Sequence, residues 1–413
     1  MPDIKIDTGD TAWMLVSAAL VMLMTPALGF FYGGLVRRKN VLSTIMHSFF
    51  ILALVSVMWA LWGYSLAFGP DVGGAGLIGG LDWFGLKGVG FEPNKDYAAT
   101  IPHQLFMVYQ MMFAVITPAL ITGAFAERKR FKAFVIFTVL WSTLVYSPLA
   151  HWVWGAGGWI HNLGALDFAG GTVVHISSGI AALVCALVIG KRVGLGKEEM
   201  EAHDVPMVVL GAGLLWFGWF GFNAGSALSS GPLAVNAFVV THLAAAMGAL
   251  TWTTLSWIRQ GQPSVLGAAA GSVAGLVAIT PASGFVNSSG ALCIGLGAGA
   301  LCYGAVFLKN RFGFDDALDV FAVHGVGGIW GAIATGLFAT KAVNSAGADG
   351  VFYGSFDLIW KQFVAVGAAV AFSGVVTFAI LKLLDVTIGL RVADKQEVQG
   401  LDVSQHGETA YGL

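Results

Sequence analysis

The chain contains 413 residues, of which 57% are hydrophobic and 11% are charged, and its formal net charge is −2. Together with a mean hydropathy of +0.78, this composition excludes a soluble globular domain and indicates an integral membrane protein. The small net charge offers no basic field for nucleic acid, so no nucleic-acid partner is expected. Glycine contributes 57 residues, about twice its ~7% average share, which favours closely packed helices.

Apolar runs long enough to cross a bilayer as helices recur along the whole chain. The first follows "MPDIKIDTGDTAW", which lacks the basic start of a cleaved signal peptide, so we expect a retained span. In all we predict eleven spans, at residues 10–35, 41–68, 101–126, 131–150, 168–190, 206–228, 234–258, 264–282, 288–308, 317–340 and 357–384.

Lysine and arginine residues are distributed unevenly between the two ends of these spans. Of the 21 such residues, 16 follow odd-numbered spans and five follow even-numbered spans or precede the first. By the positive-inside rule, the N-terminus is expected outside the cell and the C-terminus in the cytoplasm. A multi-pass protein of the cell membrane is therefore predicted.

A weak internal sequence similarity predicts that the first ten spans form two inverted five-helix repeats, at about 10–190 and 206–340. "GFFYGGL" (29–35) in span one is similar to "GFNAGSA" (221–227) in span six, and "LDFAGGTVVH" in span five to "LDVFAVH" in span ten. The all-α transmembrane domain would then cover 1–384, with 357–384 as an extra helix and 385–413 as a cytoplasmic tail.

Two histidines lie inside the fifth spans of these repeats. His175 follows Asp167 by eight residues, and His324 follows Asp319 by five, which places them roughly 12 Å and 7–8 Å along opposed helices. The two imidazoles should therefore approach each other near the middle of the bilayer. Intramembrane ionisable groups usually mark a pathway or a proton relay, although a histidine inside a span can also serve packing alone.

Glycine and aspartate residues near the two histidines are expected to have structural roles. Gly179 and Gly328 each follow a histidine by four residues, so the same helix face carries little bulk. Asp167 directly precedes a helix, where a carboxylate can cap backbone N–H groups and also attract an incoming cation. For Asp319 we expect a structural, electrostatic role of the same kind.

Six motifs in this order resemble those of the ammonium transporter family, Amt/Mep/Rh, and are closest to its bacterial and archaeal Amt branch. They are "GFFYGGLVRRKN" (29–40), "ITGAFAERKRF" (121–131), "DFAGGTVVH" (167–175), "WFGFNAGSA" (219–227), "DDALDVFAVHGVGGIWG" (315–331) and the tail "GLRV...EVQGLDVSQHGETAY" (389–411). The resemblance covers essentially the whole chain.

The resemblance implies roles for two pairs of residues in the pore. His175 and His324 match the twin histidines that line the family's narrow hydrophobic pore and can relay a proton. Phe113 and Phe222 match the stacked aromatic pair that closes its outer mouth.

The resemblance also implies an external vestibule. Trp154 and Ser226, bordered by Phe113, match the site where the family recruits ammonium, and Asp167 matches the buried aspartate beneath it. Trp219 would support the same wall. Tyr109 stands near the outer gate at a position where phenylalanine is often expected, which would change the polarity of the vestibule.

Partners follow from the same resemblance. The family assembles as a homotrimer with one pore per subunit, and many members bind a cytoplasmic PII-type regulatory protein. The loops and the tail at 389–411 would contact that partner. No catalytic residues, metal ligands or cofactors are expected, because no nucleophile–base pair or ligand cluster stands out and Cys185, Cys293 and Cys302 all lie in apolar runs.

The predicted function is ammonium transport. The cation would be recruited at the aromatic vestibule and deprotonated, and ammonia would pass the two histidines, with a possible proton relay along the pair. Two alternatives stay open from the sequence. One is an ammonium sensor with little flux, and the other is a proton-coupled carrier of another small solute.

Overall fold

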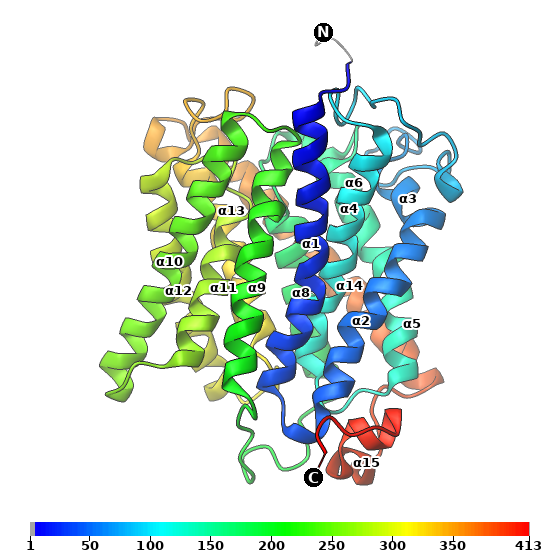
Figure 1. The fold of residues 1–413 in the computed structure, drawn as a ribbon, viewed down its shortest axis with the longest axis vertical. Helices are drawn as coiled ribbons and strands as arrows, with labels where there is room; N and C mark the ends of the chain where they lie inside the picture. Colours follow the sequence, from blue (N-terminus) through cyan, green and yellow to red (C-terminus); the bar gives the residue numbers. More distant parts are fainter. Residues whose placement is uncertain (1–4, 413) are drawn as a thin grey trace.

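The computed structural model describes residues 5–412, which form a bundle of helices with no β-strand (Figure 1). Each of the eleven predicted spans corresponds to a helical segment within the described residues. They are α1 (Thr8–Leu35); α2, η2 and α3 (Val41–Met58, Trp59–Gly63, Tyr64–Phe68); α4 with η4 (His103–Ile121, Thr122–Phe125); α5, η5 and α6 (Phe131–Trp141, Ser142–Tyr146, Ser147–Trp154); η6 with α8 (Gly171–Ile176, Ser177–Ile189); α9 with η7 (Val205–Ala224, Gly225–Ala227); α10 (Pro232–Gln260); α11 (Val265–Ile279); α12 (Ser288–Phe312); η8 with α13 (Phe321–Val326, Gly327–Phe338); and α14 (Asp357–Thr387).

Ten of these segments are long and apolar enough to cross a membrane, whereas α11 is shorter than the predicted span at 264–282. Its 15 residues extend only about 22 Å at 1.5 Å per residue. The chain then turns at residues 280–286, which are buried inside the protein. This turn needs no contact with lipid, so its irregular backbone is tolerated at membrane depth.

Side-chain caps begin several helices where the sequence places Asp, Asn or Ser. Asp7 accepts from the backbone N–H of Asp10 at the start of α1, and Asp204 accepts from that of Met207 at the start of α9. Ser264 caps α11 in the same way. Such caps satisfy N–H groups that have no partner within the helix.

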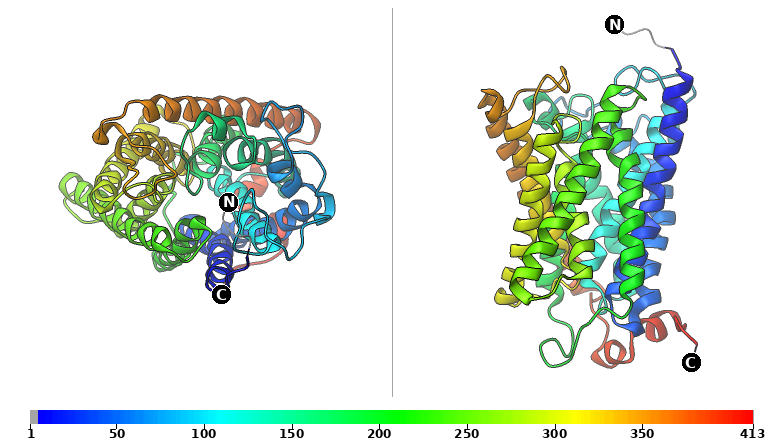
Figure 2. Two further views of the ribbon diagram at one scale, coloured as in Figure 1. Left: turned by 90° about the horizontal axis from the view of Figure 1, so that it is seen from above. Right: turned by 60° about the vertical axis from the view of Figure 1, so that its left-hand side comes forward.

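The two predicted halves meet through equivalent helices. The first helices, α1 and α9, pack along each other, and the fifth segments, η6–α8 and η8–α13, cross each other. Helix α14 contacts α5, α8 and α13, and Figure 2 shows it running obliquely along one side of the bundle. The chain ends lie at opposite faces, which we name the N-face, where α1 begins, and the C-face, where α1 ends (Figure 1).

Glycines allow the two histidine-bearing segments to touch. A Cβ on Gly179 would lie 2.1 Å from the backbone nitrogen of Gly325, and a Cβ on Gly328 would lie 3.0 Å from the Cβ of His175. Any larger residue at Gly179 would push the two helices apart. The low bulk predicted beside the histidines is therefore used for close helix crossing.

Several charged residues in the loops of the C-face are buried. Arg128 is 0% exposed, and its guanidinium donates to the carbonyl oxygens of Ala124, Ala126, Gly190 and Asp315. This side chain therefore joins three loops and satisfies its own donors within the protein.

A network of ion pairs surrounds Arg128. Glu127 pairs with Arg37 at 2.8 Å and with Arg192 at 3.2 Å, and Arg192 also binds both carboxylate oxygens of Asp315. Burial opposes ionisation of Glu127 and Asp315, but the neighbouring guanidinium groups outweigh it and hold the pKa of each carboxyl below its usual range. We call this group the C-face cluster; it consists of Arg37, Glu127, Arg128, Arg192 and Asp315.

The tail packs onto this face through α15 (Asp394–Gln399) and η10 (Asp402–His406). Glu397 accepts from the backbone N–H of Val193 and pairs with Arg391, and Asp402 accepts from the backbone N–H of Ser43. The tail thus contacts the same loops as the C-face cluster.

Candidate functional site

The two histidines meet where η6 and η8 cross. Nδ1 of His175 lies 3.2 Å from Nδ1 of His324, and the rings are 5.3 Å apart at an angle of 25°. One proton can be shared between these two nitrogens, so one ring donates and the other accepts. Nε2 of His175 is buried and has no hydrogen-bond partner among residues 5–412.

Both histidines lie in short π-helical turns rather than in regular α-helix. The turns are η6 (Gly171–Ile176) and η8 (Phe321–Val326), and such turns recur at functional sites because they displace a side chain from its α-helical position. The apolar pattern of the sequence did not distinguish them from ordinary helix.

Asp167 caps the segment that carries His175. Its carboxylate oxygens accept from the backbone N–H groups of Gly170, Gly171 and Thr172, each at 2.7 Å. The backbone carbonyl of Asp167 also accepts from Nε1 of Trp154 at 3.0 Å. Asp167 therefore acts through its own helix and through Trp154.

The counterpart of Asp167 in the second half is Asp316, not Asp319. Asp316 is fully buried and accepts from the backbone N–H of Phe321 at the start of η8. Asp319 instead forms an ion pair with Lys309. The sequence contained a signal for this correction, because Asp316 precedes His324 by eight residues, the same spacing that separates Asp167 from His175.

Two phenylalanine rings close the path from the N-face to the histidines. The centroids of Phe113, on α4, and Phe222, on α9, are 4.2 Å apart. Phe222 also stacks above His175, with centroids 6.1 Å apart and an angle of 26° between the rings. An ion could pass only if these rings moved.

A cavity of about 200 Å³ lies on the N-face side of this ring pair. Phe113, Trp154 and Ser226 line it together, and the rings of Phe113 and Trp154 meet edge to face at 6.0 Å. We call this cavity the vestibule. It contains the three residues predicted for ammonium recruitment.

The vestibule also contains polar groups that the sequence analysis did not single out. Gln110, one turn before Phe113 on α4, lines it with a buried Oε1 atom that accepts no hydrogen bond within residues 5–412. Asp96, in the loop before α4, adds a carboxylate to the lining. Gln110 could have been found from its spacing to Phe113, since residues three apart on a helix share a face.

Trp219 does not form the vestibule wall. Its ring stacks on His175 with centroids 5.4 Å apart, and its Nε1 atom donates to the hydroxyl of Thr280. It lines a much smaller cavity of about 10 Å³, together with Phe222 and the two histidines. That volume holds about one water-sized molecule.

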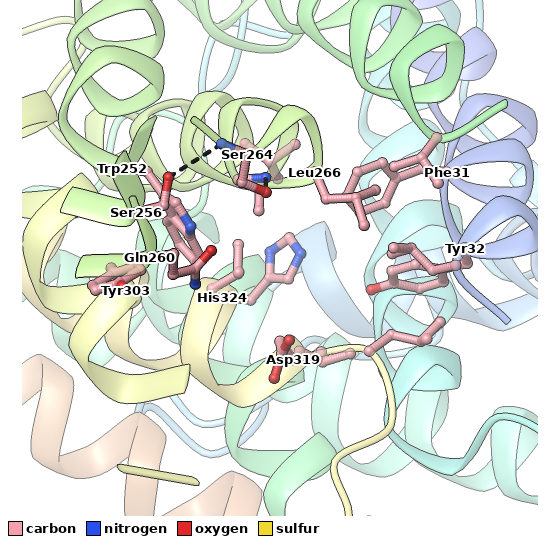
Figure 3. A pocket seen from close by; sticks show the side chains of 18 residues that line it. Phe31, Tyr32, Trp252, Ser256, Gln260, Ser264, Leu266, Tyr303, Asp319 and His324 are labelled. Atoms are coloured by element: carbon pink, nitrogen blue, oxygen red, sulfur yellow. Dashed lines mark hydrogen bonds between the residues drawn. The ribbon is translucent and has the colours of Figure 1, made fainter. Parts of the chain in front are cut away.

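A third cavity of about 240 Å³ opens on the C-face side of His324 (Figure 3). His324, Phe31 and Val273 line both this cavity and the small cavity beside Trp219, so the two spaces are neighbours. Figure 3 shows Gln260, Ser264 and Asp319 around the same cavity. Phe222 lines the small cavity and contacts Phe113, which lines the vestibule, so the three cavities follow one another through the bundle.

The walls of the vestibule and of the small cavity suit solutes of different charge. Aromatic faces and oxygen acceptors at the vestibule suit a small cation, whereas the apolar walls of the small cavity do not solvate a charge.

Comparison with known proteins gives consistent matches over almost the whole chain. The model of the Ammonium Transporter Family matches residues 12–411. An ammonium transporter of Bacillus subtilis is 57% identical over 404 residues, covering 98% of each chain. Ammonium transporter Amt1 of Archaeoglobus fulgidus is 48% identical over 403 residues, covering 98% of this chain and 99% of the relative.

Solved structures with the same fold include Mep2 and a protein named as a sensor. The crystal structure of Saccharomyces cerevisiae Mep2 matches with a TM-score of 0.89 at 39% identity, covering 95% of this chain and 89% of that chain. A structure named Sensor Amt Protein matches with a TM-score of 0.88 at 29% identity, covering 96% of this chain and 98% of that chain.

Proposed function

Because the chain belongs to the ammonium transporter family, we propose that it recruits ammonium in the vestibule and conducts ammonia past the two histidines. The observation that carries this proposal is the imidazole pair, with Nδ1 atoms 3.2 Å apart, beside a cavity of about 10 Å³. This combination offers a proton acceptor where no room exists for a hydrated ion.

The energetic argument starts from the cost of removing water from a cation. By idealised Born estimates, moving a small ion into apolar surroundings costs on the order of 20 kcal/mol, and several kcal/mol after relaxation. The vestibule can offset part of this cost, because a cation–π contact with Trp154 contributes ~0.5–2 kcal/mol and Ser226 can accept a hydrogen bond. It concentrates the cation without carrying it farther.

Loss of a proton removes most of the remaining barrier. Ammonium can release a proton and potassium cannot, so selectivity would follow from chemistry rather than from size. The neutral ammonia then crosses the small cavity. The proton would enter the imidazole pair, whose two rings titrate as a unit, and leave toward the cavity on the C-face side of His324.

The direction and assembly of the protein are part of the same proposal. The vestibule would face outward and the C-face inward, as the lysine and arginine distribution predicts. A homotrimer with one pore per subunit, and a PII-type protein bound at the loops and tail of the C-face, would follow from family membership.

A sensor is the second candidate, because a sensor Amt protein shares the fold. It would bind ammonium at the vestibule and report occupancy through the tail with little flux. The relatives with 48–57% identity are named as transporters, so transport is preferred.

Reconstituted protein separates these functions. Proteoliposomes are assayed for uptake of labelled methylammonium and for electrical current when ammonium is added, with potassium chloride as the control salt. We expect saturable uptake with an ammonium-specific current. Saturable binding without uptake would favour the sensor, and uptake without current would reject the proton relay while leaving ammonia conduction in place.

A further inference from the structure

Helix α14 holds the chain directly before Asp167 through the side chain of Gln362. This residue is 1% exposed, and its Oε1 atom accepts a hydrogen bond from the backbone N–H of Leu166 at 2.7 Å. Its Nε2 atom donates to the carbonyl oxygen of Leu166 and to that of Ala332 on α13, each at 2.9 Å. Both N–H donors and the oxygen of the amide therefore have partners inside the protein.

These three bonds join the two segments that carry the histidines. Leu166 directly precedes Asp167, whose carboxylate caps the turn η6. Ala332 follows His324 by eight residues along η8 and α13. Gln362 thus links the start of one histidine segment to the other segment, away from the point where the two cross.

A second residue of α14 holds the chain on the other side of His175. Oγ of Ser373 donates to the carbonyl oxygen of Ser177 at 2.7 Å, and Ser177 lies two residues beyond His175. Gln362 and Ser373 therefore bind the chain before and after this histidine. Because a π-helical turn is a rare backbone conformation, contacts on both sides help to keep η6 in place.

The second histidine segment is anchored at the equivalent position. Asp315 stands directly before Asp316, and the guanidinium of Arg128 donates to the carbonyl oxygen of Asp315. In each half, therefore, a side chain from outside the segment binds the residue before the capping aspartate. The anchor is Arg128 at the C-face for one half and Gln362 on α14 for the other.

The geometry of the imidazole pair is sensitive to such anchors. The Nδ1 atoms of His175 and His324 are 3.2 Å apart, at the long end of the usual hydrogen-bond range. A relative shift of the two segments by ~1 Å would break this contact. Without the amide of Gln362, the N–H and carbonyl groups of Leu166 lose their partner, so the start of η6 can move relative to α13.

We propose that Gln362 is a positioning residue of the histidine pair, through which α14 holds His175 in register with His324. This inference rests on the proposed function, because it assigns the pair a step in transport. It predicts that Gln362 acts on the rate of passage through the imidazole pair, without touching the substrate.

The test compares the wild-type protein with Gln362→Met, a side chain of similar length without hydrogen-bonding groups, in proteoliposomes. The maximal rates of ammonium-dependent current and methylammonium uptake should fall by about tenfold or more, since misplacing reacting groups by ~1 Å can cost ~10²-fold. The KM for methylammonium should change by less than about twofold, because Gln362 does not line the vestibule.

Thr377→Val is the matched control on the same helix. It also removes a buried hydrogen bond of α14, the one that Nε1 of Trp141 donates to Thr377 at 3.0 Å, but Trp141 lies on α5, which carries neither histidine. Its maximal rate should stay within about twofold of the wild-type value. An equal fall in both variants, or a normal maximal rate in folded Gln362→Met, would overturn the proposal.

A direct measurement of the imidazole pair separates positioning from a general loss of stability. In protein with isotopically labelled histidine, magic-angle-spinning NMR detects the contact between the two Nδ1 atoms, and His175→Leu identifies its signals. The contact should be present in the wild-type protein and in Thr377→Val, and weakened in Gln362→Met. A contact of wild-type intensity in Gln362→Met would reject the positioning role.

Thermal unfolding shows whether each purified variant is folded. If Gln362→Met does not fold, Gln362→Glu takes its place, since it keeps an oxygen acceptor for the N–H of Leu166 and removes the amide donors. If wild-type protein takes up no methylammonium, the proposed function fails, and the labelled histidines still report whether Gln362 holds the pair. If wild-type uptake is normal and the variant matches it, only the role of Gln362 is rejected.

Discussion

The histidine pair and the C-face cluster bury ionisable side chains in opposite ways. His175 and His324 share one hydrogen bond, and Nε2 of His175 has no protein partner within residues 5–412. In the cluster, Glu127 and Asp315 each receive two or more bonds from arginine side chains or backbone. An imidazole can be neutral, so it can remain incompletely bonded in an apolar site, whereas a buried carboxylate needs its partners.

This difference separates groups that can act on a solute from groups that hold the fold together. In the proposed mechanism, the unpartnered imidazole nitrogen exchanges a proton with a molecule in the small cavity. The carboxylates of the cluster already bind guanidinium groups, and they join loops far apart in sequence. We therefore expect changes at the pair to alter transport and changes at the cluster to alter stability.

The sharpest test of the comparison removes both imidazoles. His175→Leu combined with His324→Leu should lower the ammonium-dependent current by about 100-fold or more, because positioned proton transfer contributes typically ~10²–10⁴-fold to a rate. Current and methylammonium uptake in proteoliposomes measure the change. Selective current that survives the double substitution would reject the relay without affecting membership of the family.

Breaking the C-face cluster should act on stability instead. Glu127→Gln leaves Arg37 and Arg192 without their shared carboxylate, and loss of one buried partner typically costs ~3–5 kcal/mol. Thermal unfolding in detergent measures the loss. Glu198→Gln is the control, because Glu198 also pairs with Arg37 but its side chain is 61% exposed, and exposed pairs contribute less than ~1 kcal/mol. An equal loss of stability in Glu127→Gln and Glu198→Gln would contradict the distinction between buried and exposed ion pairs.

Lys129 tests the rule that buried ions need partners of opposite charge. It is 1% exposed, its amino group has no hydrogen-bond partner within residues 5–412, and it lies 3.8 Å from the ring centroids of both Phe125 and Phe137. Burial lowers the pKa of Lys129 to about 8. Because the folded-state pKa lies below the unfolded value, the charged form costs stability below pH 8, and this cost fades as pH rises toward ~10.4.

Lys129→Met should therefore raise the unfolding temperature at pH 7, by an amount equivalent to less than ~3 kcal/mol, since one unit of pKa corresponds to ~1.4 kcal/mol. The gain should shrink between pH 8 and pH 10. Lys132→Met, three residues along at the start of α5 and outside the buried loop, is the control. A lower unfolding temperature for Lys129→Met would show that the two aromatic rings favour the cation more than burial opposes it.

The smallest expected effect is the response of the cluster to acid. The pKa values of Glu127 and Asp315 lie below their usual range, so their stabilisation is complete above the unfolded value of ~4 and is lost as pH falls through the lowered values. Unfolding temperatures measured at decreasing pH should fall below pH ~4, and Glu127→Gln should flatten this fall. If the unfolding temperature of Glu127→Gln falls with pH as it does in the wild-type protein, Glu127 does not contribute to the loss of stability in acid.

Several features could be read from the sequence because they depend on local pattern. The eleven helical segments followed from apolar runs of sufficient length, and His175 and His324 were conspicuous because ionisable groups are rare in such runs. The equivalence of Asp167 with Asp316 could also be predicted, because each precedes its histidine by eight residues. The similarity of "LDFAGGTVVH" to "LDVFAVH" pointed to Asp319 instead.

The remaining features depend on contacts between distant segments. Trp219 could not be assigned to the small cavity rather than the vestibule, because its depth relative to His175 depends on how α9 packs against η6. Arg128 and Lys129 lie between two predicted spans in the sequence, and only the structure shows that they are buried.

The amino-acid order alone determined that this chain is a many-helix membrane protein of one family, since hydropathy and motif order are properties of the linear sequence. The folded arrangement decided which polar groups meet, which charges are buried and where the path narrows. The physical reason is that a hydrogen bond or an ion pair requires atoms within a few ångströms of each other. In a bundle of long helices, that proximity is set by crossing geometry between residues more than a hundred positions apart.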